Sequence, residues 1–546
     1  MDSNTQRFDA IVIGAGFSGM YMLRLLREKL GLNVRVYEAA ETVGGTWYWN
    51  RYPGARCDSE AYVYCFTWDR RLLQEWEWSE RYPEQPEILR YLEHVAKRHD
   101  LNRSIQFNTR VTGAHFDEVD EVWRVSTDRG DETAARYLIT AVGTLSDTNM
   151  PPFKGLEKFR GKWCHTSRFP HGGIDFTAKR VAVIGTGATA VQAIPEISQQ
   201  AKQLTVFQRT PNYCLPARNG KVDPERVKAR KLDYDGIIER VRQSVSGFEY
   251  YRIPKSVLEV TAEEREREFD RMWDQGGFAF NLANYQDMVV SQEANDICAN
   301  YLKRKIRRIV KDPIVAEKLI PKHAFGTKRT PLDTNYYETF NKHNVLLVDA
   351  NIDGPIEEVT EKGIRAGGKE YEFDIIVFAT GFDALTGPLK ALNLKGRDGL
   401  KLEVAWADGP HTYLGLSIAG FPNLFTITGP QSPSVLSNMP VSIEQHVEWI
   451  ADCIDYMRRA GKTTIEATVE AQEQWVAHVN DIVNMTLFPS TNSWYMSANI
   501  VGKPRAFLPY LNPEGVGGYR KRCAEVAAKG YEGFALTQQR RVIPLW

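Results

Sequence analysis

The sequence lacks the features that mark several large classes of protein. Its 546 residues carry no net charge, since 69 Lys and Arg balance 69 Asp and Glu, so no overall field attracts it to nucleic acid or anionic lipid. No run approaches the roughly 18 apolar residues of a membrane span, and no basic leader with a cleavage site precedes the first apolar run. Seven scattered cysteines without C-x-x-C spacing argue against a disulfide framework and a zinc site. We therefore expect a cytoplasmic globular protein without metal, nucleic-acid or membrane partners.

What the chain does have is one local pattern that occurs twice. Residues 9–14 (DAIVIG) form a short apolar run that stops at glycine, and apolar residues at helical spacing follow over 21–30. Residues 180–185 (RVAVIG) and 191–197 repeat the pattern. Two further apolar runs predict strands that return to the two sheets, at 137–143 and 374–381. The fold class predicted is α/β, with two Rossmann-like dinucleotide-binding domains.

Composition divides the chain further. Charged, helix-favouring residues dominate between 219 and 325, which predicts a helical insertion in the second domain whose charge runs are solvated helix faces. A helix around 442–459 predicts that the C-terminal part rejoins the first domain. The division expected is a first domain (1–145 and 384–546), a second domain (146–218 and 326–383) and the insertion (219–325).

The first glycine-rich turn predicts a nucleotide without a 2′-phosphate. Gly14 makes the tight turn, Gly16 lets a pyrophosphate approach the backbone, and Gly19 lets the helix pack on the strand. Glu38 lies 19 residues beyond Gly19, where a carboxylate accepts hydrogen bonds from ribose hydroxyls and repels a 2′-phosphate. This arrangement fits FAD or NAD.

The second turn predicts a phosphorylated nucleotide. Its GxGxxA sequence consists of Gly185, Thr186, Gly187, Ala188, Thr189 and Ala190. The next predicted strand ends at Arg209 and Thr210, where a cation and a hydroxyl replace the acid and accommodate a 2′-phosphate. The alternative is an ordinary surface arginine. The two sites together predict an FAD that is reduced by NADPH. A disulfide reductase would need a redox cysteine pair close to the flavin, but Cys57 and Cys65 are eight residues apart, so oxygen is favoured as the electron acceptor.

Residues 159–170 (FRGKWCHTSRFP) resemble FxGxxxHxxxW[P/D], the fingerprint of type I Baeyer-Villiger monooxygenases, with Phe169 in place of its tryptophan. The resemblance runs from residue 8 to about 534 and is closest to the cyclohexanone, phenylacetone and steroid monooxygenases. Further segments resemble the family's flavin-contact loop (44–58), catalytic segment (326–329), interdomain linker (378–383) and mobile lid (488–506, around Ser493-Trp494-Tyr495).

The resemblance implies a function. Such an enzyme uses FAD, NADPH and O2 to convert ketones to esters or lactones through a C4a-peroxyflavin, retains NADP+ during oxygenation, and is a monomer. It implies that Arg329 is catalytic, that Asp58 holds it, and that Trp494 closes over NADP+. Lys328 joins Arg209 and Thr210 at the 2′-phosphate, while His165 is structural and orients the linker. The cofactor contacts it adds are Ser18, Thr46, Trp47, Arg56, Asp58, Tyr64, Val111, Arg329 and Met439, and the substrate-pocket residues are Ser434, Val435 and Leu436.

Two alternatives stay open at this point. Flavin-containing and N-hydroxylating monooxygenases share both nucleotide folds and oxidise N or S atoms, but Pro170 and the pair Lys328 and Arg329 favour Baeyer-Villiger chemistry. A non-catalytic NADPH sensor built on the same fold is the other. The ketone itself, whether linear, cyclic, aryl or steroid, is not specified by the sequence.

Overall fold

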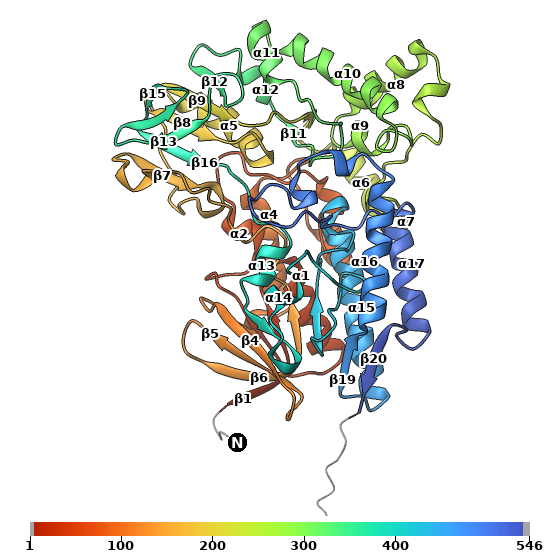
Figure 1. Ribbon diagram of the computed structural model, residues 1–546. Coiled ribbons are helices and arrows are strands. Elements are labelled where there is room, and N and C mark those ends of the chain that lie inside the picture. The colour runs from red at the N-terminus through yellow and green to blue at the C-terminus, as the bar shows by residue number, and fades with distance from the viewer. Residues whose placement is uncertain (1–4, 539–546) are drawn as a thin grey trace, which may run out of the picture.

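The computed structural model describes residues 5–538, which form two open sheets, each covered on both faces (Figure 1). In β1 (Gln6–Ile13), Ala10 and Val12 pack into one hydrophobic cluster while Ile11 and Ile13 pack into another. Successive strand residues point to opposite faces, so a continuous apolar run needs cover on both sides. The two runs that end in glycine turns are therefore central strands, and the α/β prediction is confirmed.

The first sheet has eight strands in the order β17-β4-β5-β6-β1-β2-β3, with β18 paired to β6. β1, β2, β3, β6 and β18 pair in parallel, while β4 and β5 form an antiparallel meander with β6. β18 comes from the C-terminal part of the chain, which therefore contributes a strand to the first sheet. The bounds are β1 Gln6–Ile13, β2 Val34–Tyr37, β3 Ile105–Gln106, β4 Val111–Asp117, β5 Val122–Thr127, β6 Glu132–Thr140, β17 Leu394–Lys395 and β18 Leu424–Thr426.

The second sheet is fully parallel, in the order β12-β9-β8-β16-β7. The run at 374–381 becomes β16, next to β8, as its pattern predicted. A small antiparallel sheet, β13-β14-β15, precedes β16. The bounds are β7 Lys162–His165, β8 Arg180–Ile184, β9 Gln203–Gln208, β12 Val345–Asp349, β13 Ile356–Val359, β14 Gly363–Ala366, β15 Lys369–Glu372 and β16 Ile375–Phe378.

The charged stretch between the two halves of the second sheet is helical, as predicted, and its hydrophobic cluster also includes Val63, Tyr82, Val441 and Val516 from other parts of the chain. A separate two-stranded sheet flanks it, in which β10 (Leu215–Pro216) pairs with β11 (Leu332–Asp333). Figure 1 shows most of these helices at the upper right. They are α6 Pro224–Leu232, α7 Tyr234–Gln243, α8 Ala262–Gln275, α9 Ala279–Leu282, α10 Gln292–Ile309 and α11 Pro313–Leu319.

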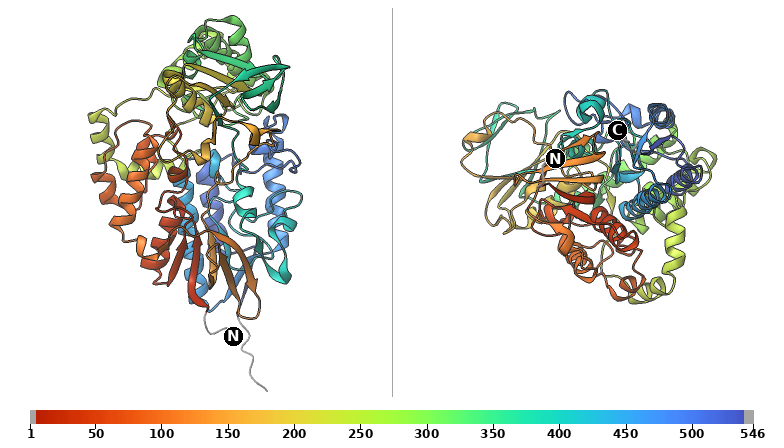
Figure 2. Two further views of the ribbon diagram at one scale, coloured as in Figure 1. Left: turned by 90° about the vertical axis from the view of Figure 1, so that its left-hand side faces the viewer. Right: turned by 90° about the horizontal axis from the view of Figure 1, so that it is seen from below.

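The remaining helices cover the sheets and fill the region between them. The helix predicted at 442–459 is α15 (Met439–Arg459), which packs on α1. In the upright views the two sheets lie one above the other (Figures 1 and 2). None of the helices within residues 5–538 is both long enough and apolar enough to cross a bilayer. The other bounds are α1 Phe17–Arg24, α2 Thr46–Trp49, α3 Arg70–Glu75, α4 Gln85–Arg98, α5 Ala188–Gln200, α12 Tyr336–Thr339, α13 Thr386–Lys390, α14 Leu402–Ala405, α16 Val469–Asn484, β19 Thr464–Ala467, α17 Gly515–Ala528 and β20 Phe534–Thr537.

Candidate active site

The first glycine-rich turn joins β1 to α1 with the geometry that a pyrophosphate site needs. Gly14 has a φ of 103°, which L side chains rarely adopt. A Cβ on Gly19 would lie 1.8 Å from the Gly14 carbonyl oxygen, whereas a Cβ on Gly16 would meet only the backbone of Gly45, at 3.4 Å. Ser18 is buried in the first turn of α1. The helix therefore sits tight on the strand while its N-terminus stays approachable by an anion.

Glu38, just beyond β2, stabilises this turn through a hydrogen bond to its backbone. The carboxylate accepts hydrogen bonds from the backbone N–H groups of Ala15 (2.7 Å) and Ala40 (2.8 Å). Burial raises the pKa of Glu38, and these backbone hydrogen bonds oppose the rise. A carboxylate offers about four lone-pair positions, so acceptor capacity is left for ribose hydroxyls. The bond to Ala15, which fixes the turn itself, is a role that the sequence did not predict.

The loop predicted to contact the flavin folds against the same turn. Its short helix α2 begins at Thr46, directly after Gly45. Trp47 Nε1 donates a hydrogen bond to the Tyr64 hydroxyl at 3.2 Å. The Tyr64 ring in turn stands edge-on to Phe17 of α1, with 5.3 Å between the ring centroids. The structure thus brings Thr46, Trp47 and Tyr64 beside the first fingerprint.

Three other residues predicted to contact a cofactor are Arg56, Val111 and Met439. The Arg56 guanidinium pairs with Glu80 and Glu84, at 3.0 Å each. Its charge is therefore already balanced within the protein, and a cofactor contact from Arg56 stays a prediction. Val111 begins β4 and is buried, and Met439 begins α15. Their contacts with FAD also stay predictions.

The second glycine-rich turn repeats the geometry of the first. Gly185 has a φ of 119°, and a Cβ there would lie 2.3 Å from the Ala379 carbonyl oxygen. A Cβ on Gly187 would meet no atom within 4 Å, so the space in front of α5 is open. The Thr186 hydroxyl donates to the Thr210 carbonyl at 2.9 Å and ties the turn to the end of β9. Residues 188–190 form the first turn of α5.

Two cations gather next to this turn from distant parts of the sequence. Arg209 and Thr210 are exposed at the end of β9, and Lys328 is half-buried beyond the insertion. Burial lowers the pKa of Lys328, and the charge of Arg209 lowers it further. Two cations that repel each other are stabilised when an anion lies between them. The arrangement fits the predicted 2′-phosphate.

The structure brings Arg329 and Asp58 into direct contact. Asp58 ends the flavin-contact loop, and Arg329 follows the insertion, 271 residues later; Arg329 Nη2 donates to Asp58 Oδ2. The guanidinium also lies 4.9 Å over the Phe278 ring. Burial alone would lower the pKa of Arg329, but the adjacent Asp58 carboxylate raises that pKa above its ordinary value. The result is a permanent cation held in one orientation.

Tyr495 is a further neighbour of this ion pair that the sequence reasoning did not assign to the site. Burial raises the pKa of the Tyr495 hydroxyl to about 12, while the charge of Arg329 beside it opposes the rise. Trp494, for which a cofactor contact was predicted, lies beside Tyr495, with 4.3 Å between the ring centroids and 51° between the ring planes. Both lie in the segment predicted to be the lid, so that segment reaches Arg329 through Tyr495.

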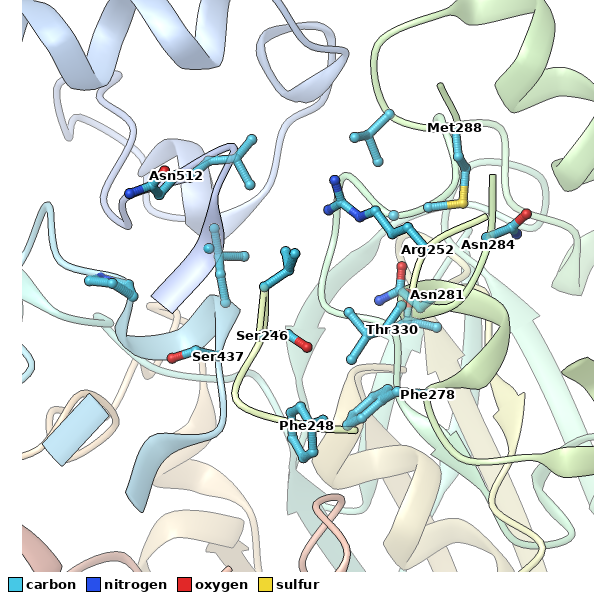
Figure 3. A pocket seen from close by; sticks show the side chains of 18 of the residues that line it. Ser246, Phe248, Arg252, Phe278, Asn281, Asn284, Met288, Thr330, Ser437 and Asn512 are labelled. Atoms are coloured by element: carbon cyan, nitrogen blue, oxygen red, sulfur yellow. The ribbon is translucent and has the colours of Figure 1, made fainter. Parts of the chain in front are cut away.

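Lys328 and Arg329 line a cavity of about 110 Å³. Figure 3 shows this cavity with Phe278 and Thr330 among its labelled side chains. Of the predicted pocket residues, Val435 and Leu436 line it, whereas Ser434 is fully buried and does not. The opposite wall comes from the insertion, which the sequence reasoning treated as a solvated helical unit. The signal that could have revealed this wall is the apolar stretch 276–283 (GGFAFNLA) directly after the charged helix α8.

Known proteins share both the sequence and this architecture. Residues 8–226 match the family of flavin-binding monooxygenase-like proteins. The chain is 46% identical, over 96% of its length and 95% of the relative's, to a Baeyer-Villiger monooxygenase of Pseudooceanicola batsensis. The chain belongs to the Baeyer-Villiger monooxygenases. A phenazine N-monooxygenase of Lysobacter antibioticus is 42% identical over 98% of both chains. The structure of cyclohexanone monooxygenase from Rhodococcus sp. Phi1 bound to NADP+ is 42% identical, with a TM-score of 0.95 over 98% of this chain and 100% of that one.

The Baeyer-Villiger fingerprint region includes β7, the strand at one edge of the second sheet. His165 ends β7, and its Nε2 lies 3.2 Å from the Thr380 hydroxyl of the linker. Burial lowers the pKa of His165 to about 4, and the charge of Arg168 contributes, so the ring is neutral at neutral pH. Phe169, which replaces the fingerprint tryptophan, packs in the core beside Phe176. The substitution therefore keeps an apolar ring at a buried position.

The predicted lid of this Baeyer-Villiger monooxygenase is fastened at several points. The hydroxyl of Thr327, in the catalytic segment, forms a hydrogen bond of 2.8 Å with the hydroxyl of Thr491 in the lid. Asn499 donates to the Phe382 carbonyl at 3.0 Å. Lys503 forms an ion pair with Asp383 and donates to the Thr386 hydroxyl at 2.6 Å. The lid therefore contacts the linker as well as the active site, and its mobility stays a prediction.

Proposed function

We propose that this chain binds FAD and NADPH, consumes O2 and converts ketones to esters or lactones, with Arg329 and Asp58 as its catalytic pair. The observation that carries the proposal is their ion pair, which joins the flavin-contact loop to the wall of the cavity. A protein that only sensed NADPH would need no such pair on a cavity wall. The arrangement thus supports catalysis over sensing.

The residues present fit both cofactors. FAD, when bound, supplies the redox chemistry and the activation of oxygen. The turn at 14–19 and Glu38 would hold its phosphates and ribose, with Trp47 and Tyr64 next to them. The turn at 185–190 would hold NADPH, and Arg209 with Lys328 would bind the 2′-phosphate. Gly187 supports this assignment, because its front is clear of protein atoms.

Arg329 has the properties of an electrostatic catalyst. Its guanidinium lines the cavity, carries a charge at all working pH values, and can donate hydrogen bonds to a ketone oxygen there. Negative charge develops on that oxygen when a nucleophile adds to the carbonyl carbon, and a preorganised donor stabilises it. Asp58 fixes the direction of the guanidinium fork. The Phe278 ring below it limits the access of water.

A second candidate reaction is the oxidation of a heteroatom, favoured by the similarity to a phenazine N-monooxygenase. Product analysis separates the two. The purified holoenzyme is incubated with NADPH, O2 and either a panel of linear, cyclic and aryl ketones or phenazine, and products are identified by mass spectrometry. Ester or lactone from at least one ketone is expected. N-oxide from phenazine, with no ester from any ketone, would overturn the proposal.

The proposal also includes a monomeric enzyme in the cytoplasm. All seven cysteines lie within the described residues, and all are buried and free of disulfides, which supports a reducing compartment. Sedimentation of the holoenzyme at micromolar concentration tests the oligomeric state, and a dimer mass would contradict the proposal of a monomer.

A further inference from the structure

Arg252 projects into the cavity from the wall that the insertion provides (Figure 3). Its position is fixed by the backbone, since the next residue, Ile253, donates its N–H to the Asn284 carbonyl at 3.1 Å. The Asn284 side chain is itself bound to the Phe280 carbonyl at 2.8 Å. The Asn281 amide faces the same cavity. A cation and a neutral hydrogen-bond donor therefore share one wall.

Within residues 5–538, no carboxylate contributes to the pKa of Arg252, which desolvation lowers. Arg252 is an exposed residue, so water still reaches its side chain where it lines the cavity. Arg329, which lines the same cavity, is paired with the Asp58 carboxylate. The residues that line the cavity, all of them within the described chain, include three cations, Arg252, Lys328 and Arg329, and no Asp or Glu.

We propose that Arg252 binds an anionic group of the substrate, so that the preferred substrates are ketones that carry a carboxylate. The proposal deepens the proposed function and rests on it. A cavity lined by three cations and by no carboxylate favours an anionic group in its occupant. The carbonyl end of the substrate would lie at Arg329 and the carboxylate at Arg252. Lys328 has a different role, because its neighbour is Arg209 at the nucleotide site.

The kinetic test compares two substrates of one shape and different charge. The holoenzyme is assayed with 4-oxocyclohexanecarboxylate and with its methyl ester, in wild type and in Arg252→Met, which keeps an unbranched side chain but removes the charge. We expect the variant to raise KM for the acid about tenfold or more and to leave KM for the ester within about twofold. Arg252→Lys keeps the charge and should retain most of the preference.

The control is Arg267→Met, an exposed arginine of α8 in the same insertion that does not line the cavity. It should behave as wild type with both substrates. Equal KM for acid and ester in wild type, or an equal loss with both in Arg252→Met, would overturn the proposal. So would a variant whose only defect is a raised KM for NADPH, because Arg252 would then serve the nucleotide.

A binding measurement separates this proposal from the proposed reaction. Cyclohexanecarboxylate has the ring and the anion but no ketone, so its binding needs no turnover. We expect it to raise the Tm of wild type and of Arg252→Lys but not of Arg252→Met, while cyclohexanol should not distinguish them. If no ketone is oxidised but this shift is seen, the reaction is wrong and the anion site stands. If the methyl ester is oxidised and the shift is missing, the anion site alone is wrong.

Discussion

Replacing Arg329 by alanine should abolish ester formation without abolishing flavin reduction. The side chain lines the cavity, is 32% exposed and is held by Asp58, so it acts as a preorganised donor in a partly dry site. Loss of one such donor lowers kcat by about 10²–10³, or ~3–4 kcal/mol in the barrier. NADPH should still reduce the bound FAD, because the residues at 185–190 and 209–210 are untouched. NADPH consumption should then yield hydrogen peroxide in place of ester.

The assay counts ester, peroxide and NADPH in the same reaction. Arg329→Lys keeps the charge but loses the planar fork that meets Asp58, so rescue should be partial. Asp58→Ala should cost less than Arg329→Ala. Because the two residues act through one contact, the double variant should resemble Arg329→Ala instead of showing the summed loss. Arg267→Ala, exposed on α8, serves as the control for folding and handling.

One result would refute this reasoning. If Arg329→Ala binds FAD normally and still forms ester at wild-type yield per NADPH, the ion pair is not catalytic, and oxidation at N or S would become the better reading of the site. Loss of flavin from the variant would not count as support, so flavin content is measured first by absorbance.

Three further outcomes follow from the same structure. Gly187→Val should fold and keep FAD, since a Cβ at this position meets no atom within 4 Å, but weaken NADPH binding more than about tenfold; unchanged affinity by titration contradicts the second-site assignment. Arg209→Ala should lower kcat/KM for NADPH about tenfold and leave NADH unchanged, and equal losses with both would remove Arg209 from the 2′-phosphate. Lys503→Met breaks the ion pair with Asp383 and should raise peroxide per NADPH; full coupling would show that this tie is dispensable.

The nucleotide-binding elements could be predicted because their requirements are local. Gly14 and Gly185 are needed for the backbone conformation of a turn, and Gly19 for the contact between a helix and the preceding strand. Such requirements leave a fixed spacing in the sequence. The role of Glu38 was predicted only in part. Its carboxylate was expected to bind the ribose, but it also accepts a hydrogen bond from the backbone N–H of Ala15 and so stabilises the turn.

The cavity wall could not be predicted in the same way. Phe278 needs only to be an apolar ring, and Arg252 only a cation, at places that tertiary packing determines. Neither requirement produces a periodic or spaced pattern. The charged residues of α8 were the stronger local pattern in the insertion, and they predict a solvated helix face instead of a cavity wall. Tyr495 was missed for the same reason, because its contact with Arg329 depends on how the C-terminal segment folds back over the second domain.

The position of Arg329 in the topology explains why its partner comes from another domain. Arg329 stands just before β11, which pairs with β10 at the base of the insertion, and its carbonyl accepts a hydrogen bond from Asn212 Nδ2 at 2.8 Å. Its backbone is thus held by the segment that enters the insertion, through the separate two-stranded sheet of β10 and β11. Asp58 belongs to the loop that contacts the first fingerprint through Gly45. The ion pair therefore joins the flavin-contact loop to the end of the insertion, and the orientation of the guanidinium depends on how these two segments pack together.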